Sequence, residues 1–137
     1  MTVLLNLDSL KNALQRFSEA LQAYDIDKAN TLYRDACIQR FEFSYELSHK
    51  MLKRFLELTA ATPSDFDEMA FPNLIRTANE RGLLLNNWER WRDFRHARNI
   101  SSHTYDESKA LQVMAILPDF LIEAQALMRE LENRNHT

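Results

Sequence analysis

The chain has 137 residues, of which 45% are hydrophobic and 27% charged, as in an ordinary globular protein. One glycine and three prolines are too few for the frequent turns of a β-sandwich or barrel, so we expect an all-α fold. The length suits one domain over residues 1–137. A formal net charge of −3 excludes the overall basic field of a dedicated nucleic-acid-binding protein, so any RNA contact must rest on a local patch.

The first sixty residues predict two helices. Apolar residues from Leu7 to Tyr24 recur at three- and four-residue spacing, which indicates a helix with Asp8 or Ser9 as its cap. From about Asp27 to Leu58 the chain lacks glycine and proline, and its apolar residues cover two adjoining faces, as in a helix packed against several neighbours. The two stripes are Leu32, Ala36, Phe43, Leu47 and Met51, and Cys37, Phe41, Leu52 and Phe55.

A loop and a short helix follow. The run of small and polar residues at 61–65 breaks the helical pattern and reads as a loop. Pro72 suits the first turn of a short helix that continues to Arg81, and Gly82 suits its closing position.

The remainder predicts two more long helices. Asn86 stands three residues before Glu89, a capping arrangement for a helix that ends near His103. After Asp106 a last helix shows the same three-four apolar spacing, and Pro118 predicts a kink or a local break in it.

These elements predict an antiparallel up-and-down four-helix bundle with one additional short helix. The sequence shows neither an export signal nor 18 uninterrupted apolar residues, so we expect a cytoplasmic protein without a membrane contact. The single cysteine, Cys37, lies in an apolar helical run and is expected to be a buried small hydrophobe.

Residues 98–105 read Arg-Asn-Ile-Ser-Ser-His-Thr-Tyr, which combines a phosphate binder with a group that titrates near neutral pH. An arginine followed by a histidine after four to six intervening residues is a weak signal, because chance alone predicts about one such match in a chain of this composition. The matches are Arg90–His96, Arg98–His103 and Arg129–His136. Only Arg98–His103 has an asparagine directly after the arginine and a tyrosine two residues after the histidine.

Helical geometry constrains this pair. On an ideal helix Arg98 and His103 point about 140° apart. One phosphate can reach both only if the helix unwinds near residues 101–103 or if a second subunit supplies part of the site. We favour a symmetric dimer that brings two copies of the segment together. The alternative is a helix end whose polar residues only cap and hydrogen-bond locally.

Four arginines lie within nine residues before this point: Arg90, Arg92, Arg95 and Arg98. Most such runs are solvated faces that pair with neighbouring carboxylates. The functional alternative is a phosphate-binding groove for RNA, in which Arg92 and Arg95 take part. Trp88 and Trp91 have the flat rings needed to stack bases, yet their helical spacing favours burial in the core.

Other chemistry has little support. His96 and His103 share a helical face, but no carboxylate or cysteine accompanies them at ligand spacing, so we expect no metal and no cofactor. His49 is expected to be a packed or surface residue. Ser101 and Ser102 lack the strained turn and the orienting group of a serine nucleophile, and one glycine cannot build a phosphate loop.

The segment from Arg98 to Glu107 resembles the HEPN superfamily, and within it the HepT-like toxins and nucleotidyltransferase substrate-binding proteins. Residues 36–47 are similar to the same branch, so the resemblance spans nearly the whole chain. His49 departs from the pattern, because an aromatic residue, often tryptophan, is expected there.

The resemblance implies a helical homodimer that pairs with a separate small nucleotidyltransferase, its antitoxin. It also implies a metal-independent endoribonuclease in which Arg98 holds the scissile phosphate and His103 acts as acid or base. Asn99 and Ser102 would support the motif, and Tyr105 matches a tyrosine that the partner adenylylates.

Two functions remain open at this point. The first is a ribonuclease toxin that acts on RNA, and the complete set of Arg98, His103 and Tyr105 favours it. The second is a non-catalytic subunit that binds nucleotide or substrate for its partner. A dimer with a purely structural role explains the arginine run least well.

Overall fold

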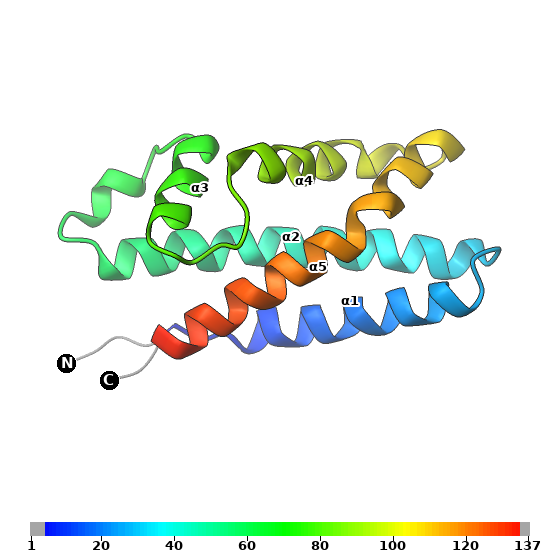
Figure 1. Cartoon of the computed structure of the whole chain (residues 1–137), viewed down its shortest axis with the longest axis horizontal. Helices are drawn as coiled ribbons and strands as arrows, with labels where there is room; N and C mark the ends of the chain where they lie inside the picture. The colour runs from blue at the N-terminus through cyan, green and yellow to red at the C-terminus, as the bar shows by residue number, and fades with distance from the viewer. Residues whose placement is uncertain (1–4, 135–137) are drawn as a thin grey trace.

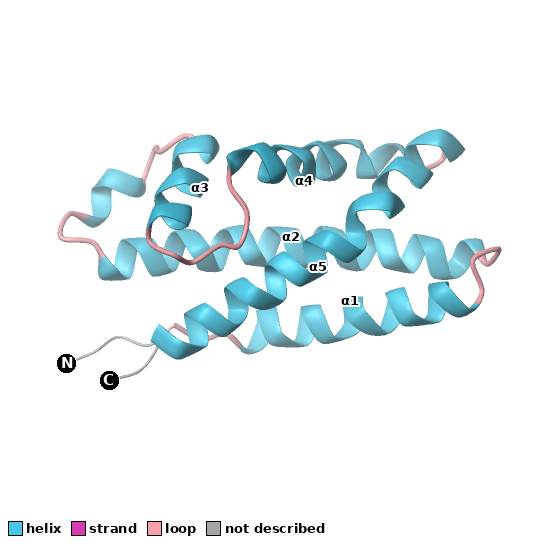
Figure 2. Ribbon diagram, in the orientation of Figure 1, coloured by secondary structure: helices cyan, strands magenta, loops and turns pink. Residues whose placement is uncertain are grey.

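The computed structural model describes residues 5–134, and all regular secondary structure in that range is helical (Figure 2). This confirms the all-α prediction. The helices are α1 (Asp8–Ile26), α2 (Thr31–Thr59), α3 (Phe71–Glu80), α4 (Trp88–Ile100) and α5 (Glu107–Arg134), with two 3₁₀ turns, η1 (Pro63–Phe66) and η2 (Ser101–His103).

The four long helices alternate in direction along the chain, as an up-and-down arrangement requires (Figure 1). α1 and α2 lie side by side, and α5 crosses them obliquely while it also contacts α4. The short helix α3 is placed between α2 and α4 and runs across them (Figure 1). The pairing of α4 with α5 and η2 positions the end of α4, where the Arg–His segment lies.

Asparagine side chains accept hydrogen bonds at the starts of the first two helices. The Asn6 side chain accepts a hydrogen bond from the Asp8 backbone N–H at 2.9 Å, so the prediction that Asp8 or Ser9 caps α1 is wrong. Asn30 caps α2 by accepting from the N–H groups of Leu32 and Tyr33 at 3.0 and 3.1 Å. This cap explains why α2 begins four residues later than the breaker-free run suggested.

The predictions around α3 are confirmed. Pro72 lies in its first turn, where a missing N–H costs nothing, and α3 ends at Glu80. Gly82 follows with φ +75°, the left-handed conformation that closes a helix and that other residues adopt only with strain. The expected loop at 61–65 contains part of η1, which begins at Pro63.

A cluster of buried aromatic rings joins α2, α4 and α5. The rings of Phe41 and Phe120 are 5.2 Å apart edge to face, as are those of Phe94 and Phe120. Trp91 packs on Phe94 at 5.4 Å and is fully buried, which confirms its place in the core and removes it as a surface for stacking bases. Trp88 is half-buried and touches Phe71 edge to face.

The two apolar stripes of α2 have different surroundings. Cys37, Phe41, Leu52 and Phe55 are all buried, as expected. On the other stripe Met51 is buried, whereas Leu32 and Phe43 are 77% and 57% exposed. The expectation that this face packs against neighbours of the same chain is therefore wrong for its N-terminal half.

α5 is the one described helix that is long and apolar enough, by length and composition, to cross a membrane. Its apolar residues pack against α1, α2 and α4, which is the environment of a core helix. The helix continues through Pro118, so the predicted local break does not occur.

A buried carboxylate on α5 holds the loop that precedes α4. Glu123 accepts from the backbone N–H groups of Leu85 and Asn86 at 2.8 and 2.9 Å, and also from the Asn86 side chain. Burial raises the pKa of this carboxyl group, and the hydrogen bonds from Asn86 and Leu85 oppose that rise. Asn86 was predicted to cap α4, but Glu123 binds its side chain and Asn87 occupies the cap position.

We expect Glu123→Ala to lower the free energy of unfolding by about 2–4 kcal/mol, because it leaves buried donors of the α3–α4 loop without an acceptor. Urea denaturation followed by circular dichroism measures this loss. Glu130→Ala is the matched control on the same helix, since its partly exposed ion pair with Arg134 contributes about 0.5 kcal/mol or less. Equal effects of the two substitutions would contradict the role given to Glu123.

Candidate functional site

The helix α4 ends between Arg98 and His103, within the Arg–His segment. α4 stops at Ile100, and Ser101–His103 form the single 3₁₀ turn η2. α5 then begins at Glu107, capped by Asp106, whose carboxylate accepts from the Ser108 N–H at 2.9 Å. A 3₁₀ turn advances about 120° per residue, so His103 still points about 160° away from Arg98. Unwinding alone therefore does not unite the pair within one protomer.

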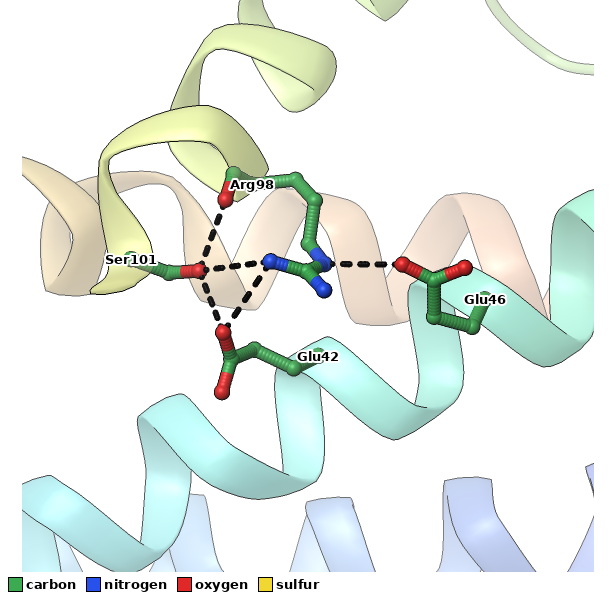
Figure 3. A network of polar contacts seen from close by, with 4 residues as sticks. All are labelled: Glu42, Glu46, Arg98 and Ser101. Carbon is green, nitrogen blue, oxygen red and sulfur yellow. Dashed lines mark hydrogen bonds and ion pairs between the residues drawn. The ribbon is translucent and has the colours of Figure 1, made fainter.

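Arg98 is anchored on α2 by two carboxylates (Figure 3). Its Nε donates to Glu46 Oε1 at 3.0 Å and its Nη1 donates to Glu42 Oε2 at 3.1 Å. The Ser101 hydroxyl lies 2.7 Å from both Glu42 Oε2 and the Arg98 carbonyl oxygen, and it also accepts from Arg98 Nη1 at 3.3 Å. The guanidinium is thus held in one orientation, and among the described residues its Nη2 has no hydrogen-bond partner (Figure 3).

Glu42, Glu46 and the anchoring role of Ser101 were not predicted from the sequence. Glu42 and Glu46 are four residues apart on α2 and so project from one helical face. That spacing was the available signal. It did not reveal the partner, because contact with Arg98 depends on how α4 lies against α2.

The remaining candidate residues of the segment, His103, Tyr105, Ser102 and Asn99, are exposed. His103 and Tyr105 stand next to each other with ring centroids 6.0 Å apart and nearly perpendicular planes. Tyr105 is 86% exposed, and Ser102 and Asn99 also face solvent. Within residues 5–134 neither Arg98 nor any other side chain hydrogen-bonds to the His103 imidazole, so it is free to exchange a proton with a ligand.

The four arginines of α4 have different partners. Arg90 pairs with Asp93 at 3.4 Å and with Asp119, as expected of a solvated face. Arg98 is held by Glu42 and Glu46, whereas Arg92 and Arg95 form no ion pair with any described residue. Arg92 and Arg95 therefore keep uncompensated charges on the surface.

A groove of about 380 Å³ lies beside Arg98, between α2, α3 and α4. It is lined by Tyr45, Glu46, His49, Phe71, Arg95, Arg98 and Asn99. The Arg95 guanidinium lies over the Phe71 ring, 5.1 Å from its centroid, and the His49 ring meets Phe71 edge-on at 4.7 Å. Burial lowers the pKa of His49, so its imidazole is neutral at physiological pH.

A second ion pair fastens the start of α5 next to Tyr105. Arg34 of α2 donates through Nη1 to both carboxylate oxygens of Glu107 at 2.8 Å. This contact raises the pKa of Arg34 and ties the two helix starts together. The loop that carries His103 and Tyr105 is therefore fixed at both of its ends, by Arg98 and by Glu107.

Neither metal-ligating side chains nor the single cysteine forms a candidate site among the described residues. Among the described residues no three His, Cys, Asp or Glu side chains are grouped to hold a metal ion. Cys37 is buried, as expected, and burial raises the pKa of its thiol to about 11. His136, the last match to the Arg–His spacing, lies outside the described residues.

Solved structures share this fold. The structure of the Haemophilus influenzae protein HI0074 is described as revealing the fold of a substrate binding domain of a nucleotidyltransferase. It superposes on this chain with a TM-score of 0.85 at 34% identity, over 93% of this chain and 99% of that one. A Thermus thermophilus protein superposes with a TM-score of 0.68 at 27% identity, over 93% and 99% of the two chains.

Sequence comparison agrees with the structural likeness. A Haemophilus influenzae protein named probable ribonuclease HepT is 45% identical over 98 residues, which is 72% of this chain and 66%, just under two thirds, of that protein. The family model for nucleotidyltransferase substrate binding protein-like sequences matches residues 5–133. The chain therefore belongs to the nucleotidyltransferase substrate binding protein-like family, in the HepT-like group to which its Arg–His segment pointed.

Proposed function

We propose that the chain is the ribonuclease of a HepT-like toxin–antitoxin pair, a metal-independent endoribonuclease of the cytoplasm. The observation that carries the proposal is the fixed orientation of Arg98 by Glu42 and Glu46, five residues before His103, whose imidazole no described side chain binds. The relative named probable ribonuclease HepT supports the same activity.

The chemistry needs only the residues of this site. The His103 imidazole removes the proton from a ribose 2′-hydroxyl, and the oxygen attacks the adjacent phosphorus. The bond between phosphorus and the 5′ oxygen breaks, and that oxygen takes a proton from solvent while His103 returns its proton to solvent, so the products are a 2′,3′-cyclic phosphate and a 5′-hydroxyl. Arg98 stabilises the charge that develops on the phosphate, using the Nη2 group that Glu42 and Glu46 leave unengaged. DNA is not a substrate because it lacks the attacking hydroxyl.

A homodimer completes the site. Arg98 and His103 point to opposite sides of the α4–η2 segment, so Arg98 of one protomer acts with His103 of its partner. The exposed stripe of α2 supports a dimer face there, because Leu32 and Phe43 are 11 residues apart and only about 20° apart around the helix. Phe43 adjoins Glu42, which anchors Arg98, so a dimer through this stripe brings the second protomer next to the site.

The neighbouring arginines of α4 attract the RNA backbone. Arg92 and Arg95 are exposed and form no ion pair within residues 5–134, so their positive charges draw in the phosphates of RNA without a fixed contact to one of them. Asn99 lies in the last turn of α4 and Ser102 lies within η2, where they support the geometry of the motif.

Regulation acts through Tyr105. A small nucleotidyltransferase, the antitoxin, transfers an adenylyl group to its hydroxyl, which is accessible because the side chain is 86% exposed. The added group places bulk and negative charge beside His103, whose ring centroid is 6.0 Å from that of Tyr105. RNA then cannot reach the imidazole.

The alternative is a non-catalytic subunit that binds nucleotide or substrate for a nucleotidyltransferase. The family's description and the published description of HI0074 favour it. Its signature is complex formation and nucleotide binding, with no RNA cleavage even at high protein concentration.

We expect the purified protein to cleave single-stranded RNA in EDTA, and His103→Ala to reduce the rate by at least about 100-fold because the proton-transfer group is gone. Gel analysis of labelled RNA measures both rates. His96→Ala is the matched control, since His96 is exposed on α4 and stands at a similar spacing from an arginine. Cleavage that requires a divalent metal, or that persists in His103→Ala, would refute the mechanism.

We expect ATP and a partner nucleotidyltransferase to add one adenylyl group to the protein, with release of pyrophosphate, and to suppress its RNA cleavage. Tyr105→Phe removes the accepting hydroxyl, so intact-mass spectrometry finds no addition and cleavage is no longer suppressed. Tyr33→Phe, at a tyrosine 41% exposed on α2, serves as the control and is modified as the wild type is. Modification that survives in Tyr105→Phe would show that another residue is the acceptor.

A further inference from the structure

We propose that the groove beside Arg98 is a nucleobase-binding subsite, in which a base stacks on the Arg95 guanidinium while His49 hydrogen-bonds to its edge. The inference rests on the proposed function, because it assigns the groove to the nucleotide that follows the scissile phosphate along the RNA.

Arg95 provides a preformed stacking surface. Its guanidinium lies over the Phe71 ring at 5.1 Å, so one face of the cation is covered by an aromatic ring. Arg95 is exposed and forms no ion pair with any described residue, which leaves its other face open to the groove. Guanidinium planes stack bases in RNA-binding proteins, and a base placed here would complete a three-layer stack of base, Arg95 and Phe71.

His49 supplies the hydrogen bonds at the edge of the base. Its ring stands at 74° to Phe71, with centroids 4.7 Å apart, and lines the same groove. The pKa of His49 is lowered first by burial, and Lys53 and Arg95 lower it further against the opposing effect of Glu46. A neutral imidazole offers one donor and one acceptor, which matches the mixed edge of a base better than a phosphate.

The groove adjoins the catalytic segment. Arg98 and Asn99 belong to both, and Arg95 lies one turn before Arg98, about 4.5 Å back along α4. A phosphate at Arg98 therefore places its neighbouring base at Arg95. The volume of about 380 Å³ falls at the lower end of the range for small-molecule sites, as suits a single nucleotide.

Glu46 shapes which ligand fits. It lines the groove and holds Arg98 through Nε, so a carboxylate shares the groove with the two cations Arg95 and Arg98. A free phosphate in the groove would meet this negative charge, whereas the exocyclic amino group of a base can donate to it. The lining thus favours a base over a second phosphate.

The test measures binding in the His103→Ala background, so that RNA is not consumed. Fluorescence anisotropy compares a short single-stranded RNA with a strand of the same length made of abasic ribose phosphates. We expect Arg95→Lys, which keeps the charge but loses the plane, to weaken RNA binding about tenfold and to leave abasic binding unchanged. Arg81→Lys is the matched control, because Arg81 lies over Phe66 at 5.8 Å, away from the groove.

A second variant tests the edge contact. His49→Phe keeps an aromatic ring but removes both hydrogen-bonding nitrogens. We therefore expect strands that differ only in their bases to bind this variant with equal affinity, and we expect abasic binding to be unchanged. Equal weakening of RNA and abasic binding by Arg95→Lys would overturn the proposal, since it would reduce Arg95 to a phosphate contact. Base-dependent binding unaffected by either variant would overturn it as well.

Two further arms separate this proposal from the ribonuclease function. If the protein with His103 intact does not cleave RNA but Arg95→Lys still weakens base-dependent binding, the base-binding proposal is supported and the ribonuclease proposal is contradicted. If RNA is cleaved while the abasic and natural strands bind equally, the ribonuclease proposal is supported and the base-binding proposal is contradicted. AMP that binds as tightly as RNA, with the same dependence on Arg95, supports the base site and assigns it to a free nucleotide.

Discussion

The anchoring of Arg98 by Glu42 and Glu46 is the interaction on which the site depends. It joins α4 to α2 two residues before α4 ends at Ile100 and the chain continues into η2. Two carboxylates offset the single positive charge, so Arg98 is not a free cation that attracts RNA from a distance. Its contribution is direction, because a guanidinium fixed through Nε and Nη1 can present Nη2 at one place only.

Attraction and catalysis therefore fall to different arginines. Arg92 and Arg95 keep unpaired charges among the described residues and suit the approach of an anionic strand, whereas Arg98 is positioned for one phosphate. Arg90 is used within the protein, paired with Asp93 and Asp119. The run that appears uniform in sequence thus contains one structural, one positioned and two free arginines.

The scarcity of glycine and proline predicted the all-α class, the positions of Pro72 and Gly82 predicted the short helix, and helical spacing predicted the burial of Trp91, because each depends on local sequence. It did not predict the anchor of Arg98, since the approach of α2 to α4 is set by the aromatic cluster around Phe120. Asn86 has the right spacing for a cap, but the buried Glu123 binds it more effectively than a solvent-exposed helix end would. The sequence could not show that the stripe with Leu32 and Phe43 would be exposed in this chain, because a stripe is equally apolar whether the same chain or a second one covers it.

Active-site complementation tests the central claim, that Arg98 of one protomer acts with His103 of the other. Differently tagged Arg98→Lys and His103→Ala protomers are mixed, and the heterodimer is purified and assayed for RNA cleavage in EDTA. Lysine keeps the charge but cannot satisfy both glutamates and a phosphate, so each homodimer is inactive.

We predict that the heterodimer recovers about half the wild-type rate, because one of its two composite sites is intact. We also predict no activity when wild type is paired with the double variant. Inactivity of the first heterodimer together with activity of the second would place both residues in one protomer and contradict the account.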